Sequence, residues 1–167
     1  NGYEIIANAN EVIQYGPSVS DRFPQQTASV RNYIAQAYFI RALIHLDLSL
    51  VYGQTYTYSA DGSHLGTAVM TTIPDVKSKI ARSTAAVTYK RILDDLQTAS
   101  DMFADGWTKG CYYASPAACK ALMARVYLYM GNYSEAKKCA SEVIADYGLS
   151  LTPRSDYVAM FCARKEG

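Results

Sequence analysis

Histidine and aspartate side chains are the first candidates for chemistry in this chain, because a catalytic pair needs both within hydrogen-bond reach. His45 lies in an apolar stretch beside Arg41 and Asp47. Residues two positions apart on a helix point to different faces, so His45 and Asp47 form no catalytic pair. A single histidine in such a stretch predicts a buried, hydrogen-bonded side chain. His64 lies in a loop rich in Gly, Asp and Ser, where we expect it to face solvent.

Cysteines and aspartates also lack the spacing that a metal site or a nucleophile requires. The four cysteines have no CxxC pair and no histidine at zinc-ligand spacing, so we expect mostly buried or free thiols. They are Cys111, Cys119, Cys139 and Cys162. Four aspartates resemble a metal cluster in composition only, since a helix spreads them over its solvated face. They are Asp94, Asp95, Asp101 and Asp105.

The sequence therefore predicts no metal, no cofactor and no catalytic role. No GKS motif follows Gly62 and Gly66, so a phosphate-binding loop is absent from the sequence. An α-helical hydrolase is disfavoured because a triad, a metal site and a pair of inward carboxylates are all missing.

Arg41 and Arg125 each lie in an otherwise apolar helical stretch. An unpaired buried charge is very costly, so each guanidinium should be paired or should donate to carbonyl groups. Asp95 is a candidate partner. We expect Arg41, Asp95 and Arg125, together with Tyr127, to organise the packing of the helices rather than to bind a ligand.

Tyrosine is unusually frequent, with 15 Tyr against 4 Phe and 1 Trp. Several tyrosines fall on helical stripes or at motif positions described below, and we expect them in the core: Tyr38, Tyr52, Tyr89, Tyr127, Tyr133 and Tyr147. Five aromatic residues fall in loops: Tyr56, Tyr58, Trp107, Tyr112 and Tyr113. An exposed aromatic face can stack on the C–H side of a sugar ring. Packing of these side chains back onto the helices is equally common, so both alternatives stay open.

Composition limits the class of protein. The 16 Lys and Arg against 15 Asp and Glu give a net charge of +1, which argues against a nucleic-acid binder. Of the 167 residues, 50% are hydrophobic and 19% are charged, so the chain can bury one sizeable core. Residues 35–52 are the most apolar stretch, but Arg41, His45 and Asp47 in their middle favour a buried helix over a membrane span.

Hydrophobic periodicity predicts helices over 3–15, 26–52, 83–103, 116–130 and 133–147. We expect Gly16-Pro17 to end the first helix, Ser115-Pro116 to start the fourth, and Asn132 with Glu135 to start the fifth. Turn residues make about 53–82 one long irregular loop. Residues 116–147 have the spacing of a tetratricopeptide repeat, without a second in-register copy. The predicted fold is all-α, with tetratricopeptide-like antiparallel helix pairs.

Four stretches in order resemble the SusD/RagB family of glycan-binding outer-membrane lipoproteins of Bacteroidetes. AQAYFIRAL at 35–43, with LVYG at 50–53, is similar to the family pattern A-x-A-x-F-x-R-A-L followed by Y/F-G. Arg82-Ser83 with Asp95-Leu96 resembles the family's R-s and D-L positions. ALMARVYLYMGNY at 121–133 is similar to A-L-L-A-R-V-Y-L-x-x-G-d-Y, and 136–151 resembles A-x-x-x-A-x-x-V-I-x-x-x-x-x-L. The sequence departs from the family at Gln54-Thr55-Tyr56 and at Gly110-Cys111-Tyr112, both of which are loop positions.

The resemblance implies a SusD-like helical core and a non-catalytic role in nutrient uptake. A glycan or oligosaccharide would be captured and delivered to a SusC-like TonB-dependent transporter. The resemblance also implies an outward-facing lipoprotein of the outer membrane, associated with the membrane only through an N-terminal lipid anchor that is absent from this chain. Family members are much longer, so residues 1–167 are expected to be one helical region of a larger protein. Their sugar-contacting aromatic residues lie mainly outside this span. The alternative is a tetratricopeptide-like scaffold that binds a partner protein.

Overall fold

The computed structural model describes residues 1–75, 77, 79–104, 107, 110, 112–147 and 151–162. Helices account for the regular structure of this part of the chain, and an isolated antiparallel bridge joins Leu65 to Thr84. The elements are α1 (Gly2–Arg22), η1 (Pro24–Gln26), α2 (Thr27–Tyr52), η2 (Tyr56–Tyr58), α3 (Ala85–Met102), α4 (Pro116–Tyr129), α5 (Tyr133–Asp146) and α6 (Tyr157–Cys162). The prediction of an all-α fold is confirmed.

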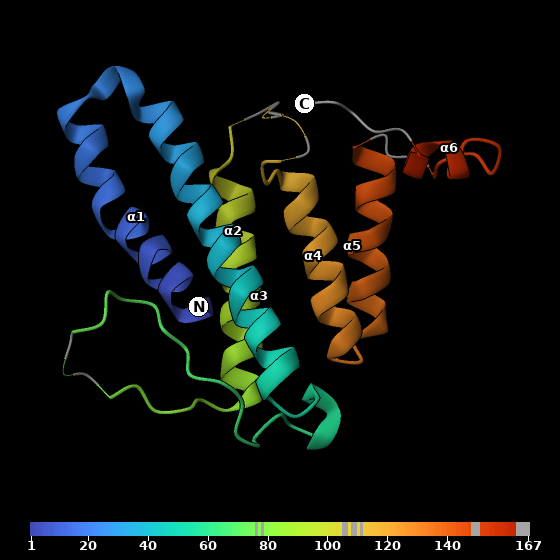
Figure 1. Ribbon diagram of the computed structural model, residues 1–167, viewed down its shortest axis with the longest axis horizontal. Helices are drawn as coiled ribbons and strands as arrows, with labels where there is room; N and C mark the ends of the chain where they lie inside the picture. Colours follow the sequence, from blue (N-terminus) through green and yellow to red (C-terminus); the bar gives the residue numbers. More distant parts are fainter. Residues whose placement is uncertain are drawn as a thin grey trace.

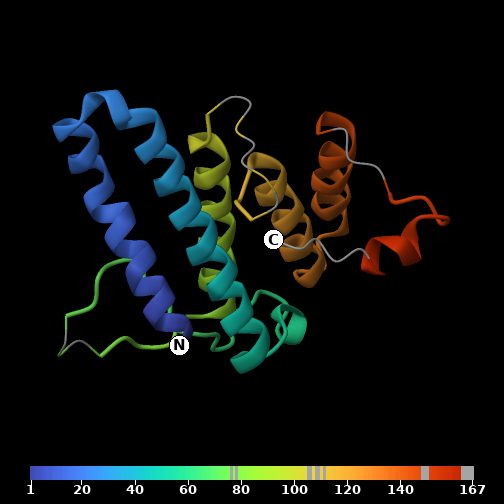
Figure 2. The same ribbon diagram turned by 45° about the horizontal axis from the view of Figure 1, so that its top comes forward.

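The helices form a row in which each packs on the next along the chain. α1 packs on α2, α2 on α3, α3 on α4 and α4 on α5. Figures 1 and 2 show this row from two directions, with α1 at one end, α5 at the other and the short α6 beyond α5. Because α2 is covered by α1 and by α3, its apolar surface is enclosed on more than one side, as its sequence predicts.

Side-chain caps define the starts of the later helices. The hydroxyl of Thr84 accepts from the backbone N–H of Val87, and that of Ser115 accepts from Ala118. The Asn132 side chain accepts from the N–H of Glu135 at the start of α5. Gly131 makes the turn before it with φ of +74°, a conformation that glycine adopts without strain. The predicted starts at Ser115-Pro116 and at Asn132 are therefore confirmed, and α3 begins at Ala85, two residues after the predicted 83.

The predicted end of the first helix is wrong. α1 continues through Pro17 to Arg22. A proline inside a helix removes its own N–H donor and crowds the carbonyl four residues before it, and Pro17 lies on the exposed side of α1. Gly16 is buried against α2, where an added Cβ would meet the Ile34 side chain at 2.6 Å. This close packing of α1 on α2 outweighs the local preference of Gly-Pro to end a helix.

The main core lies between α2, α3, α4 and α5. It is formed by Ala42, Leu46, Tyr89, Ile92, Leu96, Leu122, Met123, Val126 and Cys139. A second cluster lies nearer the α3–α4 connection and is formed by Ala35, Ala99, Phe103, Ala114 and Cys119. By length and hydropathy alone, residues 24–52 could cross a membrane. Arg41 pairs with Asp95 of α3 and His45 accepts from the N–H of Met70 in the long loop, so both polar side chains are enclosed by the fold, as in the core helix of a globular protein.

Residues 53–84 connect α2 to α3 by a long excursion past the start of α1 (Figure 1). The prediction of an irregular loop at about 53–82 is confirmed, apart from the single 3-10 turn η2. Its two arms pair where the N–H of Gly66 donates to the carbonyl of Ser83 at 2.8 Å and the N–H of Ser83 donates to that of Thr67 at 3.0 Å. The Tyr3 hydroxyl donates to the carbonyl of Ala68 at 3.1 Å and fastens the loop to α1.

Candidate functional site

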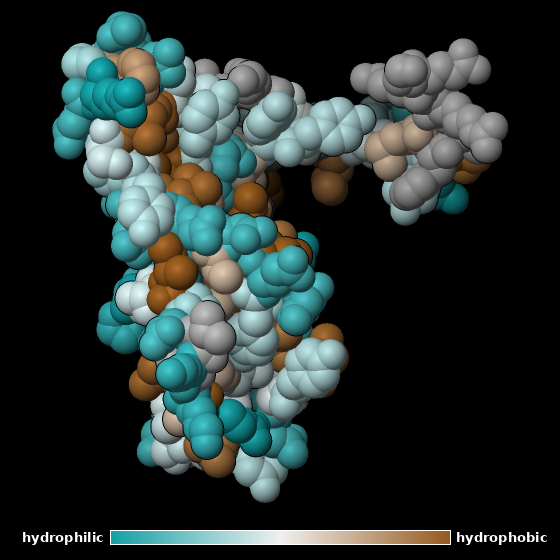
Figure 3. Space-filling view, turned by 60° about the vertical axis from the view of Figure 1, so that its left-hand side comes forward, coloured by the Kyte–Doolittle hydropathy of each residue, from teal (hydrophilic) through white to brown (hydrophobic). Residues whose placement is uncertain are grey.

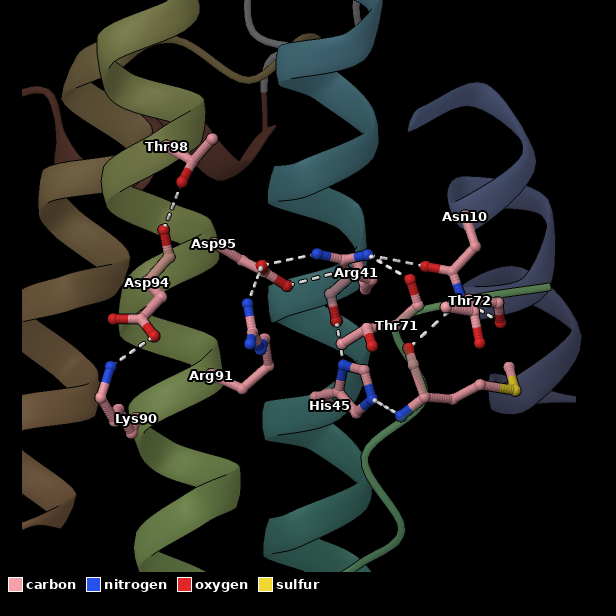
Figure 4. Close-up of polar contacts among 11 residues, drawn as sticks. Asn10, Arg41, His45, Thr71, Thr72, Lys90, Arg91, Asp94, Asp95 and Thr98 are labelled. Atoms are coloured by element: carbon pink, nitrogen blue, oxygen red, sulfur yellow. Dashed lines mark hydrogen bonds and ion pairs between the residues drawn. The ribbon is translucent and has the colours of Figure 1, made fainter. Parts of the chain in front are cut away.

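A buried ion pair joins α2 to α3 (Figure 4). Arg41 Nε donates to Asp95 Oδ2 at 2.7 Å, and Arg41 Nη2 donates to Asp95 Oδ1 at 2.7 Å. The exposed fractions of the two residues are 3% and 1%. The remaining nitrogen, Nη1, donates to Asn10 Oδ1 at 2.7 Å and to the carbonyl of Thr71 at 3.3 Å. Both charges are paired within the fold, as the position of Arg41 in an apolar helix requires.

The same network holds the long loop against the bundle. The Asn10 amide of α1 donates to the carbonyls of Met70, at 3.3 Å, and Thr72, at 2.9 Å. Asn10, Arg41 and Asp95 therefore connect α1, α2, α3 and residues 70–72 in one chain of hydrogen bonds (Figure 4). Both charged groups of this hydrogen-bond network, Arg41 and Asp95, already have partners, so neither is available for acid–base catalysis.

His45 is fully buried beside this network, as predicted. Its Nδ1 lies 2.9 Å from the carbonyl of Arg41, and its Nε2 lies 3.2 Å from the N–H of Met70. The carbonyl can only accept and the N–H can only donate, so Nδ1 carries the proton and Nε2 accepts. Burial lowers the pKa of His45 below its ordinary value, which keeps the ring neutral in the folded state.

Stability is expected to fall as the pH is lowered from about 6.5, because His45 stays neutral in the folded chain while the unfolded chain takes up a proton. The loss reaches at most about 1.4 kcal/mol per pH unit until the folded histidine also titrates. Urea unfolding at pH 7.5 and 5.5 measures this dependence. A His45→Gln variant should show a smaller change between the two pH values, and an equal change in both proteins would contradict the assignment.

The structural prediction for Arg125 is wrong. Arg125 is exposed, and within the described residues it forms no ion pair. Leu122 and Val126 face the core from α4, and Arg125 points away from them into solvent. Asp95, the candidate partner for the two arginines, pairs with Arg41. Tyr127 packs half-buried against the main core.

The prediction that His64 faces solvent is also wrong. Its side chain is half-buried, and its Nδ1 lies 2.7 Å from the Ser59 hydroxyl. The ring stands edge-on to Tyr58 at 5.3 Å. These contacts fold the loop over the ring, which the run of Gly, Asp and Ser does not indicate.

Reactive groups in the described part of the chain do not assemble into a metal or thiol site. No group of three His, Cys, Asp or Glu side chains there could hold a metal ion. Cys119 and Cys139 are buried free thiols, and burial raises the pKa of Cys119 to about 12, so its thiol is a poor nucleophile. Asp105, Cys111 and the side chain of Cys162 lie outside the described residues.

The five loop aromatics lie in two separate places. Trp107, Tyr112 and Tyr113 belong to the connection between α3 and α4, at the opposite end of α3 from η2 (Figure 1). The Trp107 ring stacks on Phe103 at 6.3 Å, and its Nε1 donates to the carbonyl of Ala114 at 3.2 Å. Tyr112 is 93% exposed. They share no surface with Tyr56 and Tyr58.

Tyr56 contributes to a cleft that the sequence did not reveal. The cleft has a volume of about 230 Å³ and lies where η2 approaches the turn between α4 and α5. We call it the tyrosine cleft; it is lined by Leu50, Thr55, Tyr56, Thr57, Tyr89, Leu128, Tyr129, Gly131 and Tyr133. The Tyr56 and Tyr89 rings lie 4.9 Å apart at the inner wall, while Tyr129 and Tyr133 are 41% and 70% exposed.

Three tyrosines predicted to be core lie on the surface. Tyr52 is 72% exposed, Tyr133 is 70% exposed and Tyr147 is 41% exposed. Tyr133 is the first residue of α5, and its side chain points toward the tyrosine cleft rather than toward the main core. One sequence signal does indicate this pairing: Tyr129 and Tyr133 flank the Gly131-Asn132 turn on both sides.

A second surface feature is an apolar groove between α1 and α2. It has a volume of about 400 Å³ and is lined by Ile5, Asn8, Ala9, Val12, Tyr33, Gln36, Ala37 and Ile40. Figure 3 shows apolar side chains gathered on this face of the molecule. The groove carries no charged side chain.

The row of antiparallel helix pairs defines a helical repeat-like protein, and the described residues hold no catalytic arrangement. Residues 1–128 match the SusD-like_3 family, described as starch-binding and associating with the outer membrane, and the chain belongs to this family. No curated protein matches the chain.

Solved structures agree with this assignment. A SusD superfamily protein from Bacteroides thetaiotaomicron VPI-5482 has a TM-score of 0.84 and 30% identity, over 93% of this chain and 34% of that one. A putative sugar binding protein from Bacteroides vulgatus ATCC 8482 has a TM-score of 0.82 and 28% identity, over 96% of this chain and 36% of that one. A laminarin binding SusD-like protein shares the fold, with a TM-score of 0.76 and 20% identity, over 99% of this chain and 34% of that one. The chain thus spans about a third of the length of these relatives.

Proposed function

We propose that this chain is the helical region, residues 1–167, of a longer non-catalytic protein that binds glycans for nutrient uptake at the outer membrane. The observation that carries the proposal is the family match over residues 1–128, whose description names starch binding and the outer membrane. Two relatives point the same way. One is described as laminarin binding, and another was solved with a xylogluco-oligosaccharide.

The polar interior supports binding rather than catalysis. Arg41, Asp95 and His45 use their polar atoms in contacts within the fold. A catalytic acid or base must instead reach a substrate through a cleft. The tyrosine cleft and the groove between α1 and α2 are both lined by uncharged side chains.

The partner in this proposal is a SusC-like TonB-dependent transporter, with the full-length protein facing outward from the outer membrane on a lipid anchor. A gene for such a transporter next to the full-length gene supports the partnership. Co-purification of the two products from membranes, with the transporter gene deleted as a control, tests it directly. Failure of the proteins to co-purify would count against the partnership.

Protein binding is the second candidate function, and one surface favours it. Between α4 and α5 runs a shallow groove of about 480 Å³, lined by Ala124, Arg125, Leu128, Tyr133, Ala136, Lys137 and Ala140. Exposed apolar side chains with two cations beside them are typical of a surface that a partner protein covers. The two functions are compatible, because a helical scaffold can contact a transporter while another face holds the glycan.

Calorimetry on the full-length protein tests glycan binding. The titrants are laminarihexaose, maltohexaose, a xyloglucan heptasaccharide and hexagalacturonate. We expect saturable binding of at least one neutral oligosaccharide, with a Kd in the range of about 1 μM to 1 mM. This range corresponds to a binding free energy between about −8 and −4 kcal/mol. Binding of none of them, or of none in a wider panel on an affinity gel, would contradict the proposed function.

A further inference from the structure

We infer that the tyrosine cleft is a subsite for one neutral hexopyranose ring of an oligosaccharide, an inference that rests on the proposed glycan-binding function. Four separate elements bring phenol rings to this one place. They are η2 with Tyr56, α3 with Tyr89, α4 with Tyr129 and α5 with Tyr133. Tyr129 and Tyr133 are neighbours across the α4–α5 turn, whereas Tyr56 and Tyr89 come from distant parts of the sequence, so their meeting with the first pair is an arrangement of the fold.

The size of the cleft suits a single small ring. Its volume of about 230 Å³ lies below the roughly 300–1,000 Å³ typical of pockets for drug-sized ligands. The faces of sugar rings carry C–H groups that stack on aromatic side chains, and hydroxyl groups stand around their edges. Tyr129 and Tyr133, at the exposed rim, can offer the ring faces for such stacking.

The chemistry of the lining selects an uncharged ligand. Its side chains are tyrosines, leucines and two threonines, and none of them is ionised at neutral pH. Burial raises the pKa of Tyr89, and the nearby Tyr129 and Tyr56 hydroxyls raise it further. The phenol therefore keeps its proton and carries no charge at neutral pH. The lining itself offers a uronic acid or a phosphorylated sugar no cation; Arg125 and Lys137 line the neighbouring groove, which shares Leu128 and Tyr133 with the cleft.

The inner wall is already ordered. The Tyr56 ring is tilted by 59° against Tyr89, whose exposed fraction is 2%. Within η2, the N–H of Tyr58 donates to the carbonyl of Thr55 at 2.9 Å. On the other side, an added Cβ on Gly131 would lie 3.6 Å from Thr57 Cγ2, so the α4–α5 turn rests against η2. A ligand entering this cleft has little protein to order, which favours binding.

Substitution of the two rim tyrosines allows an effect on binding to be measured without an effect on folding. With 41% and 70% exposure, Tyr129 and Tyr133 contribute little to the core, so alanine variants should remain folded by circular dichroism. Tyr15 on α1 is 57% exposed, lies outside the cleft and provides a matched control.

Calorimetry on the full-length protein and its variants tests the subsite with the same four oligosaccharides. A Tyr129→Ala/Tyr133→Ala double variant should bind the preferred neutral oligosaccharide about tenfold more weakly than the wild type, whereas Tyr15→Ala should stay within about twofold. Tyr133→Phe should keep most of the affinity, because it retains the ring face.

The outcomes distinguish the two proposals. Unchanged affinity of the double variant, in a wild type that binds a neutral oligosaccharide, overturns the subsite and leaves the proposed function standing. Preference of the wild type for hexagalacturonate also overturns the subsite, because the lining has no cation. Absence of glycan binding by the wild type overturns the proposed function and the subsite with it.

Discussion

Replacing Asp95 with alanine is expected to lower the free energy of unfolding by about 3–5 kcal/mol, the usual cost of leaving one partner of a buried pair alone. Arg41 would keep its hydrogen bonds to Asn10 and Thr71 but would lose both bonds to a carboxylate and remain enclosed. Urea unfolding followed by circular dichroism measures the change.

The neighbouring Asp94 provides the control. It pairs with Lys90 at 2.7 Å on the surface, where the side chains are 43% and 75% exposed, so Asp94→Ala should cost less than about 1 kcal/mol. If the cost at Asp95 comes from an unpaired charge, the Arg41→Met/Asp95→Leu double variant should be more stable than Asp95→Ala alone. Equal costs at Asp94 and Asp95 would show that the buried pair does not stabilise the fold.

Leu96→Ala is expected to lower the free energy of unfolding by about 2–5 kcal/mol, the range for a large-to-small change in a packed core. Leu96 is fully buried in the main core between α2, α3 and α4. The surrounding side chains would leave part of the vacated space unfilled, which adds to the lost burial of the side chain.

Leu128 on α4 is a matched leucine with 54% exposure, so Leu128→Ala should cost less than about 1 kcal/mol in the same urea experiment. The difference between the two variants measures how well α3 is packed. A loss below 1 kcal/mol at Leu96 would contradict the close packing of the main core.

The starts of the helices could be predicted because their signals are local. Thr84, Ser115 and Asn132 each satisfy the N–H three residues ahead, which depends only on the nearby sequence. The pairing of Arg41 with Asp95 could be anticipated for a different reason, since a charge in an apolar helix requires a partner somewhere in the fold.

The exposure of Arg125 and Tyr133 could not be predicted in the same way. α4 is apolar around most of its circumference, so its sequence does not indicate which face meets α3 and α5. Continuation of α1 through Pro17 depended on contacts with Ile34 of the next helix. The tyrosine cleft requires four elements to meet, and only the three-dimensional arrangement specifies that meeting.

The succession of helices also has a kinetic consequence. Contacts between consecutive helices keep most partners close in sequence, and chains with low contact order fold quickly. The pairing of α2 with α3 is the costly step, because residues 53–84 must close a long loop before any contact forms between them. Arg41 and Asp95 are 54 positions apart and lie across this closure. Their bonds therefore stabilise the contact between α2 and α3, whose formation requires the entropic cost of closing the 53–84 loop.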